Sequence, residues 1–472
     1  MAMINMKRTY IFALTLSIAI SAFSITLNDA KALYNNGEYE KALQAFKELL
    51  AKNSKSAKDA NLNNYAGLCL YNLGEYDQSI PYFTIAESKS IPDASKHLAM
   101  IAFNNYEFED ALDYIETYQE SLAKAKKVMP QEFESFISRA VNAQNMLDRV
   151  ENIQIIDSIN VDAETFFKFY KFSRECGSLN SSDILPKEFE AAPYSVVYQP
   201  ESKAQMLWAT FNADSVETLV ASSILSDDTW EQPQELDEAI NTGNSNYPYM
   251  MPDGITLYFA NDGENSIGGY DIFFSRKDED GFLQPQNMGM PYNSLHNDYM
   301  LVIDEMTGLG WWATDRNQID EQVTIYTFIP NEIRVNYPTE TPNLINLAKV
   351  NAISDTWVED RDYTKILDKL NDIENFETQN HANQFSLTLP NGKVYTSISD
   401  FKNEEAIQAM QEYLDELDTL NNLIQQVSQL RVDYSNGLKE IAPEIKVLEQ
   451  KILTQRSSLT RLRNMVVSLE CK

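Results

Sequence analysis

Apolar residues recur at helical spacing through the first third of the chain, and three segments there can be aligned. They read LYNNGEYEKALQAF (33–46), LYNLGEYDQSIPYF (70–83) and AFNNYEFEDALDYI (102–115). Their starting points are 37 and 32 residues apart, close to the roughly 34-residue period of helix-turn-helix repeats. We therefore expect paired helices over residues 25–148.

Each copy places a small residue three positions after an aromatic one, and a small side chain lets neighbouring helices approach closely. The positions are Tyr39 with Ala42, Tyr76 with Ser79, and Phe108 with Ala111. This motif resembles the tetratricopeptide repeat family. The resemblance implies a curved solenoid whose concave face binds peptide or protein. An ordinary helical bundle is the alternative.

Between residues 149 and 340 the pattern changes to the apolar-polar alternation that is typical of strands. Three longer units follow one another, with Ala209, Ala260 and Ala313 in corresponding places at steps of 51 and 53 residues. Each unit predicts a series of short strands rich in aromatic and β-branched residues. Units of four strands and about 50 residues indicate β-propeller blades.

The middle unit holds the most specific residues of this region. Asp253 and Gly254 are expected to form a hairpin turn, and a GGYD motif follows at 268–271. We expect structural roles in the blade for Gly268, Gly269, Tyr270 and Asp271, because glycine permits close strand approach. The unit is similar to the WD-like, TolB-type propeller repeats of cell-envelope proteins from Bacteroidota.

A propeller needs at least four blades to close, and three units are recognisable. Residues 151–190, or the hairpin expected at 385–397 around Asn391-Gly392, are candidates for a further blade or a closing strand. The hairpin belongs to a mixed segment, 341–400, that also predicts a helix near 362–376.

The final segment, 401–472, predicts two long helices with apolar residues at three- and four-residue steps. Asn436-Gly437 interrupts the pattern, and Pro443 suits the first turn of the second helix. We expect an antiparallel coiled-coil hairpin. An intermolecular coiled coil, and thus self-association, is the alternative.

Residues 1–24 predict a signal peptide. Lys7 and Arg8 precede an apolar run, and Ala22-Phe23-Ser24 offers small residues for cleavage before Ile25. The protein is therefore expected to be exported, and to be periplasmic or associated with the outer membrane. An uncleaved anchor is the alternative, although the run is shorter than the roughly 20 residues that span a bilayer.

Composition narrows the function classes further. With 38 basic and 70 acidic residues the formal charge is −32, which disfavours nucleic acid as a partner. The three cysteines include no CxxC pair, and Cys176 with Cys471 is the only plausible disulfide. No enzyme motif or metal-ligand spacing occurs among the three histidines. We expect no enzymatic activity, no cofactor and no metal.

The order of signal, tetratricopeptide repeats and TolB-like units resembles Bacteroidota envelope proteins, including the periplasmic component of type IX secretion. Those proteins usually end in an OmpA-like domain that binds peptidoglycan. No such domain is recognisable in this sequence, so the resemblance does not imply peptidoglycan anchoring. The resemblance implies a non-enzymatic scaffold in a cell-envelope complex with protein partners. A carbohydrate- or peptidoglycan-binding protein is one alternative, with Trp311 and Trp312 as stacking candidates. A propeller-type hydrolase is the other.

Overall fold

The computed structural model describes residues 25–226, 229–279, 281–358, 361, 363, 366, 387–389, 393–395, 398–435 and 438–470. The chain divides into two compact units, one ending at Val141 and the other beginning at Asn142. The signal peptide expected at 1–24 lies outside the described residues. So do nearly all of the helix expected near 362–376, both turns Asn391-Gly392 and Asn436-Gly437, and Cys471.

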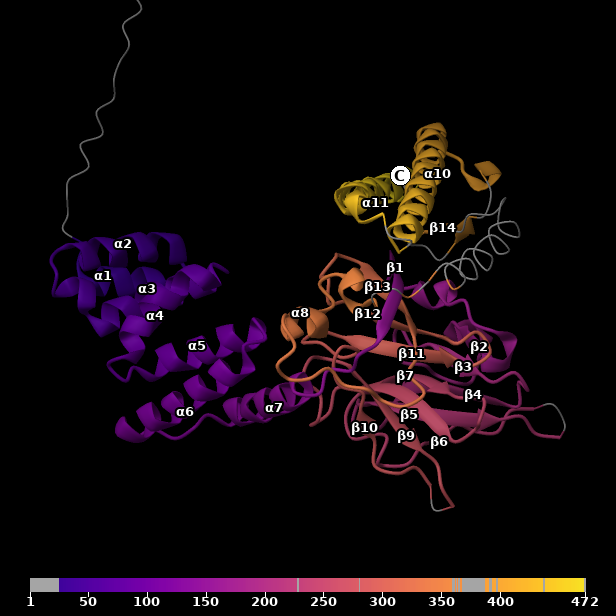
Figure 1. The fold of residues 1–472 in the computed structure, drawn as a ribbon, viewed down its shortest axis with the longest axis horizontal. Coiled ribbons are helices and arrows are strands. Elements are labelled where there is room, and N and C mark those ends of the chain that lie inside the picture. Colours follow the sequence, from indigo (N-terminus) through magenta and orange to yellow (C-terminus); the bar gives the residue numbers. More distant parts are fainter. Residues whose placement is uncertain are drawn as a thin grey trace, which may run out of the picture. The chain divides into compact units, whose positions relative to one another are not determined.

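The first unit is a succession of helices in which each one from α1 to α6 packs against the next, and α7 contacts α6 through the rings of Phe133 and Tyr118 (Figure 1). A capping box at Thr26 begins the first helix. The Thr26 hydroxyl accepts the backbone N–H of Asp29, and the Asp29 carboxylate accepts the backbone N–H of Thr26. The bounds are α1 Leu27–Asn35, α2 Tyr39–Ala51, α3 Ala60–Asn72, α4 Tyr76–Glu87, α5 Pro92–Asn104, α6 Phe108–Lys124 and α7 Gln131–Leu147, with a 3-10 turn at Ser56–Lys58. The last helix crosses the boundary between the units.

The turns inside the three helix pairs share one backbone conformation. Gly37 and Gly74 adopt φ values of +78° and +79°, which glycine tolerates because it has no Cβ. Tyr106 occupies the third turn with φ +67°. The third copy therefore keeps the turn geometry although the glycine is absent.

Three antiparallel sheets of four or five strands form the main part of the second unit among the described residues (Figure 1). The first has the order β2-β3-β4-β5-β6, the second β10-β9-β8-β7 and the third β1-β13-β12-β11. Their strands are β1 Gln154–Asp162, β2 Ser178–Asn180, β3 Val197–Gln199, β4 Gln205–Phe211, β5 Glu217–Ser223, β6 Gln234–Glu235, β7 Ser245–Met250, β8 Thr256–Asn261, β9 Asp271–Arg276, β10 Gln286–Asn287, β11 Asp298–Asp304, β12 Leu309–Thr314 and β13 Gln322–Ile329. Ala209, Ala260 and Ala313 lie on the second strands of the recognised units, β4, β8 and β12, and all are buried.

The three sheets share a hydrophobic core. Strand β7 contacts β3, β4 and β5 of the first sheet, and β11 contacts β7, β8 and β9 of the second. A tyrosine hydroxyl crosses each of these interfaces: Tyr198 donates to the carbonyl of Met250 at 2.7 Å, and Tyr249 to that of Ile303 at 2.9 Å. The interface between sheets is thus repeated as well as the sheets themselves.

Strand β1 precedes the other strands in sequence and forms the outer edge of the third sheet, where it pairs antiparallel with β13. Of the two candidate segments for a closing strand, residues 151–190 join the large sheets, whereas the described strands of the 385–397 hairpin do not. Three 3-10 turns follow: η2 Phe166–Phe169 against β1 and β2, η3 Arg174–Cys176 against β11, and η4 Ser182–Ile184 after β2. Within the described ranges no closed propeller is shown, because this irregular segment, and not a fourth sheet, links the third sheet to the first.

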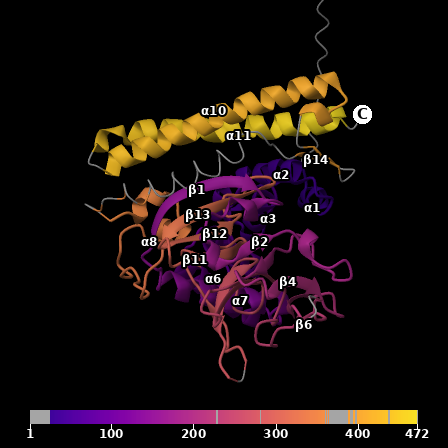
Figure 2. The same ribbon diagram turned by 90° about the vertical axis from the view of Figure 1, so that its right-hand side faces the viewer.

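The remaining elements are mainly helical. A short helix, α8 Leu344–Lys349, is followed by further 3-10 turns. Among the described residues, β14 Leu387–Thr388 and β15 Val394–Tyr395 form a separate two-stranded sheet. Helices α10 Glu404–Ser435 and α11 Ala442–Glu470 lie side by side (Figure 2). They run antiparallel, because Asn403 beside the start of α10 donates to the carbonyl of Leu469 at 2.9 Å.

No helix in the described part of the chain is both long enough and apolar enough to cross a membrane. Cys69 and Cys176 are buried free thiols, and burial raises the pKa of each. The proposed disulfide partner of Cys176 is outside the described residues.

Candidate functional site

The aligned positions of the helical repeats fall at matching places in α2, α4 and α6. Ala42, Ser79 and Ala111 are fully buried, and Ser79 donates its hydroxyl to the carbonyl of Tyr76 at 2.6 Å. The aromatic positions Tyr39, Tyr76 and Phe108 each begin a helix. Their burial differs, since Tyr76 is 45% exposed and Phe108 is buried.

Replacing Ala111 with leucine is expected to destabilise the helical unit by about 1–3 kcal/mol, because three extra heavy atoms enter a fully buried helix contact. The free energy of unfolding in urea measures this effect. Glu116→Leu, at an exposed position of the same helix, is the matched control and should change stability little. An unaltered unfolding curve for Ala111→Leu would show that the proposed repeat register is wrong.

A run of partly exposed rings connects the first helices of successive pairs. We call it the aromatic ladder, and it comprises Tyr34 on α1, Tyr65 and Tyr71 on α3, and His97 on α5. The rings of Tyr34 and Tyr65 are 5.5 Å apart, and those of Tyr71 and His97 are 4.6 Å apart, both edge to face. Lys31 places its ammonium 4.9 Å from the Tyr65 ring. Sequence alignment of the second helices did not reveal this feature, because the ladder lies on the first helices.

His97 is the titratable member of the ladder. Burial is the main reason that its pKa lies below the ordinary value, and Lys96 adds to the effect. Its Nδ1 lies 2.6 Å from the Asp93 carbonyl oxygen and its ring stacks on Phe83 at 5.2 Å. The neutral imidazole is therefore favoured, and the ladder presents aromatic surface more than charge.

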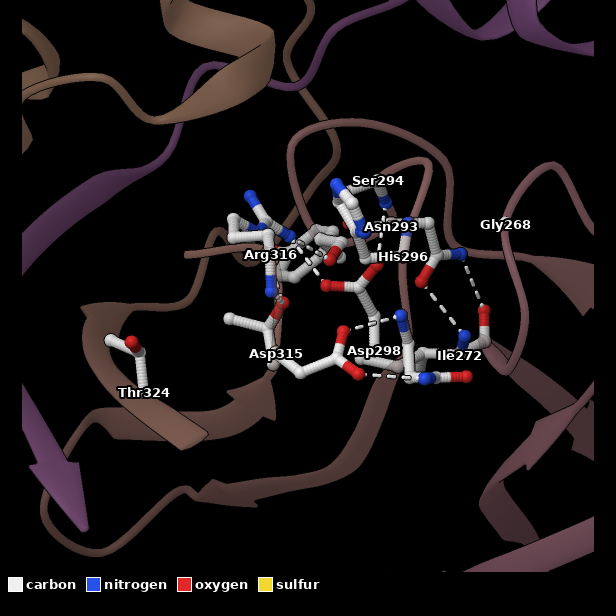
Figure 3. Close-up of polar contacts among 12 residues, drawn as sticks. Gly268, Ile272, Asn293, Ser294, His296, Asp298, Asp315, Arg316 and Thr324 are labelled. Carbon is white, nitrogen blue, oxygen red and sulfur yellow. Dashed lines mark hydrogen bonds and ion pairs between the residues drawn. The ribbon is translucent and has the colours of Figure 1, made fainter. Parts of the chain in front are cut away.

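In the second unit, an asparagine and an aspartate form a clamp that occurs twice. Asn244 donates its backbone and side-chain N–H groups to Asp262, both at 2.8 Å. Asn297 does the same to Asp315, at 2.8 and 2.7 Å (Figure 3). Both members of the clamp repeat at a step of 53 residues.

Each clamp also ties one sheet to the next. The side-chain oxygen of Asn244 accepts the backbone N–H of Glu217, and that of Asn297 accepts the N–H of Tyr270. A second pair of asparagines works in the same way. The side chain of Asn241 accepts from the backbone N–H of Leu219 and donates to its carbonyl, and Asn293 makes the same two hydrogen bonds with Ile272 (Figure 3). Sequence reasoning missed these asparagines, although their regular spacing was a usable signal.

The GGYD motif lies directly beside the second clamp. A Cβ at Gly268 would come 2.1 Å from the carbonyl oxygen of His296, and one at Gly269 would come 2.2 Å from the side-chain oxygen of Asn297. Tyr270 donates its hydroxyl to Glu217 at 2.5 Å. The two glycines therefore stand where the chain passes closest to the next sheet.

Asp271 is fully buried and organises the loop before β9. Its carboxylate accepts hydrogen bonds from the backbone of Ile267 and Gly268 and from the side chain of Asn287. Burial raises the pKa of Asp271 to about 8, while the Asn287 hydrogen bond opposes this rise. These side-chain hydrogen bonds of Asp271 join this loop to β10.

The third sheet contains a buried ion pair between Arg316 and Asp298 (Figure 3). The Nη2 atom of Arg316 is 2.7 Å from the Asp298 carboxylate and donates to the Tyr292 carbonyl at 2.6 Å. The other carboxylate oxygen of Asp298 accepts hydrogen bonds from the backbone N–H and the hydroxyl of Ser294. This arrangement is a structural network, since the Asp298 carboxylate is shared between the guanidinium of Arg316 and the Ser294 donors.

The remaining candidates are also accounted for by structure. Asp253 accepts the backbone N–H groups of Ile255 and Thr256, and Gly254 has φ +68° in the same turn. Trp311 and Trp312 point to opposite sides of β12 into different hydrophobic clusters, and they are only 2% and 0% exposed. Among the described residues, no group of acidic, histidine or cysteine side chains is arranged to hold a metal ion.

Comparison with protein families matches residues 27–94 to the tetratricopeptide repeat. The matched region contains α1 to α4 and the first three members of the aromatic ladder. Tetratricopeptide repeats are typically non-catalytic modules that bind other proteins. No curated protein and no solved structure matches the chain.

Proposed function

We propose that this chain is a non-enzymatic protein-protein interaction scaffold, and that its helical unit binds a protein partner. The observation that carries the proposal is the tetratricopeptide match over residues 27–94. Repeats of this kind stack helix pairs into an extended surface that binds peptide or protein. The partly exposed aromatic ladder lies on helices of the same repeats.

Physical reasons support the ladder as the contact surface. Tyrosine supplies a large contact area and loses little conformational entropy, and it is enriched at protein interfaces. The edge-to-face contacts between Tyr34 and Tyr65, and between Tyr71 and His97, hold these rings in place before a partner arrives. Preorganised side chains reduce the entropy cost of binding.

We further propose that the scaffold acts in a cell-envelope complex in the periplasm or at the outer membrane, in secretion or in outer-membrane assembly. The signal-like pattern of residues 1–24 supports export. The repeated sheets and clamps, with β1 at the edge of the third sheet, support a propeller-type domain. The antiparallel pair α10 and α11 is proposed as a docking arm, with self-association as the alternative.

The other candidate functions have less support. Carbohydrate binding through Trp311 and Trp312 requires exposed rings, and both side chains are buried. Hydrolysis rests on analogy with other propellers alone. The polar clusters described above have structural partners, so neither alternative is favoured by a particular site.

A photocrosslinking amino acid placed at Tyr65 is expected to capture one or a few discrete proteins in living cells. The reason is that Tyr65 lies in the middle of the ladder and is partly exposed. p-Benzoylphenylalanine retains the aromatic ring and reacts only with groups in direct contact. The measurement is the pattern of crosslinked bands from envelope and soluble fractions, with the proteins identified by mass spectrometry.

The matched control is the same amino acid at Lys47, which is exposed on α2. Lys47 should give no adduct, or different and weaker ones, and both variants should unfold at the temperature of the unmodified protein. A folded Tyr65 variant that yields no specific adduct would contradict the scaffold proposal. Adducts confined to cytoplasmic proteins would retain the scaffold and reject the envelope location.

A further inference from the structure

A cavity of about 430 Å³ opens in the second unit beside the second asparagine clamp. It lies where β11 begins and where β12 joins β13, and residue 163 after β1 completes it. Its lining residues are Ala163, Tyr247, Tyr270, Asn297, Tyr299, Asp315, Gln318, Ile319, Asp320, Glu321, Gln322 and Val323. Its volume is within the range of small-molecule and side-chain binding sites.

Tyrosine rings form the aromatic part of the lining. Tyr247 and Tyr299 stack with their centroids 4.4 Å apart, and Tyr270 meets Tyr247 edge to face at 5.9 Å. Phe166 packs against both stacked rings from η2, at 5.9 and 5.3 Å. These contacts fix the rings, so the cavity has a preformed aromatic surface.

Two hydroxyl groups in this cavity have unused hydrogen-bonding capacity. Tyr247 and Tyr299 are only 8% and 7% exposed, yet within the described ranges neither hydroxyl has a hydrogen-bond partner. Neither hydroxyl oxygen belongs to the fully enclosed polar atoms that lack a partner, so both remain open to solvent. The two hydroxyls line the cavity and are therefore available to a ligand that enters it.

The charge of the lining is entirely negative. Asp315, Asp320 and Glu321 contribute carboxylates, and no basic side chain lines the cavity within the described part of the chain. Asp315 is held by Asn297, whereas Asp320 and Glu321 are exposed at the rim. The net charge of −32 adds a long-range field of the same sign.

We propose that this cavity binds the ammonium or guanidinium group of a basic side chain presented by a partner protein. Aromatic rings and carboxylates together select a cation, since ring faces and acidic groups both attract positive charge. The two tyrosine hydroxyls supply the acceptors that such a group needs. The acidic rim on the 318–322 loop then steers the basic residue toward the cavity.

Binding of a basic side chain at this cavity does not depend on partner binding by the helical unit. The cavity belongs to a different unit of the chain, and its chemistry is not one that the family match provides. Failure of one proposal therefore leaves the other standing.

The test is a binding titration of the full chain with the peptide acetyl-Gly-Gly-Lys-Gly-Gly-amide, followed by saturation-transfer NMR. The acetyl-lysine version of the peptide has the same backbone without the charge and should bind about tenfold more weakly or not at all. Pentylamine, an amine without a peptide backbone, is the competing ligand. The lysine peptide should saturate the site and compete with pentylamine, and added salt should weaken its binding.

Variants test the assignment of the site. Asp320→Asn with Glu321→Gln should weaken binding of the lysine peptide about tenfold, and Tyr299→Phe should weaken it several-fold. Glu305→Gln, an exposed acid at the opposite end of β11, should bind as the unmodified chain does. Because the two rim residues are exposed, their replacement tests the proposal even if Tyr299→Phe does not fold.

Equal binding of the lysine and acetyl-lysine peptides would overturn the proposal, and so would unchanged binding by the rim variant. Binding of pentylamine combined with no binding of the lysine peptide would overturn the assignment to a partner protein, because the site would then take only free amines.

Discussion

Replacing Arg316 with methionine is expected to destabilise the sheet-containing unit by about 3–5 kcal/mol. The side chains of Arg316 and Asp298 are 5% and 0% exposed, so the substitution leaves a carboxylate buried without its cation. The guanidinium also lies over the rings of Trp312 and Tyr326, at 6.0 and 5.7 Å. Chemical denaturation, followed by tryptophan fluorescence, measures the loss.

A second substitution distinguishes the effect of the unpaired Asp298 carboxylate from the effect of the packing lost with the Arg316 side chain. Asp298→Asn in the Arg316→Met background removes the negative charge, and its remaining oxygen can still accept from Ser294. The double variant should therefore be more stable than Arg316→Met alone. If the double variant is less stable, the buried charge is not the main cause. Arg316→Lys should lie between the unmodified protein and Arg316→Met, because it keeps the charge and loses the forked geometry.

Gly268→Ala is expected to cost about 3 kcal/mol or more, since the new methyl group would meet backbone that cannot rotate away. The obstructing atoms are the carbonyl oxygens of His296 and Ser294, at 2.1 and 2.7 Å from the added Cβ. To remove the clash, the second and third sheets must separate locally. The free energy of unfolding and the near-ultraviolet circular dichroism report this change.

Gly254→Ala is the matched control in the same sheet. Its Cβ would meet no atom within 4 Å, and its cost comes only from the φ of +68°, about 1–2 kcal/mol. A larger effect at Gly254 than at Gly268 would contradict the role assigned to the close approach between sheets.

Both predictions concern residues whose importance depends on neighbours far away in the sequence. GGYD is recognisable as a motif, but the obstacle to a side chain at Gly268 comes from 294–296, in the next repeat unit. Arg316 gives no sequence signal for burial, since arginine is normally exposed. Its burial follows from Asp298 and the aromatic residues that β11, β12 and β13 bring around it.

Local pattern was sufficient for the helical repeats and for the mixed α and β class of the fold. Helix periodicity and the turns at Gly37 and Gly74 depend on residues close together in the chain, and the family match confirms the tetratricopeptide assignment for residues 27–94. The aromatic ladder was not apparent, because its rings meet across helices α1, α3 and α5.

Tertiary structure alone decided how the sheets are completed and which residues line the cavity. Strand β1 pairs with β13, more than 150 residues later, and no local pattern specifies a partner so distant. The cavity likewise combines residues from β7, β11 and the loop between β12 and β13 with residue 163. Alternation of apolar and polar residues determines that strands form, whereas packing between sheets determines which tyrosines share a cavity with which carboxylates.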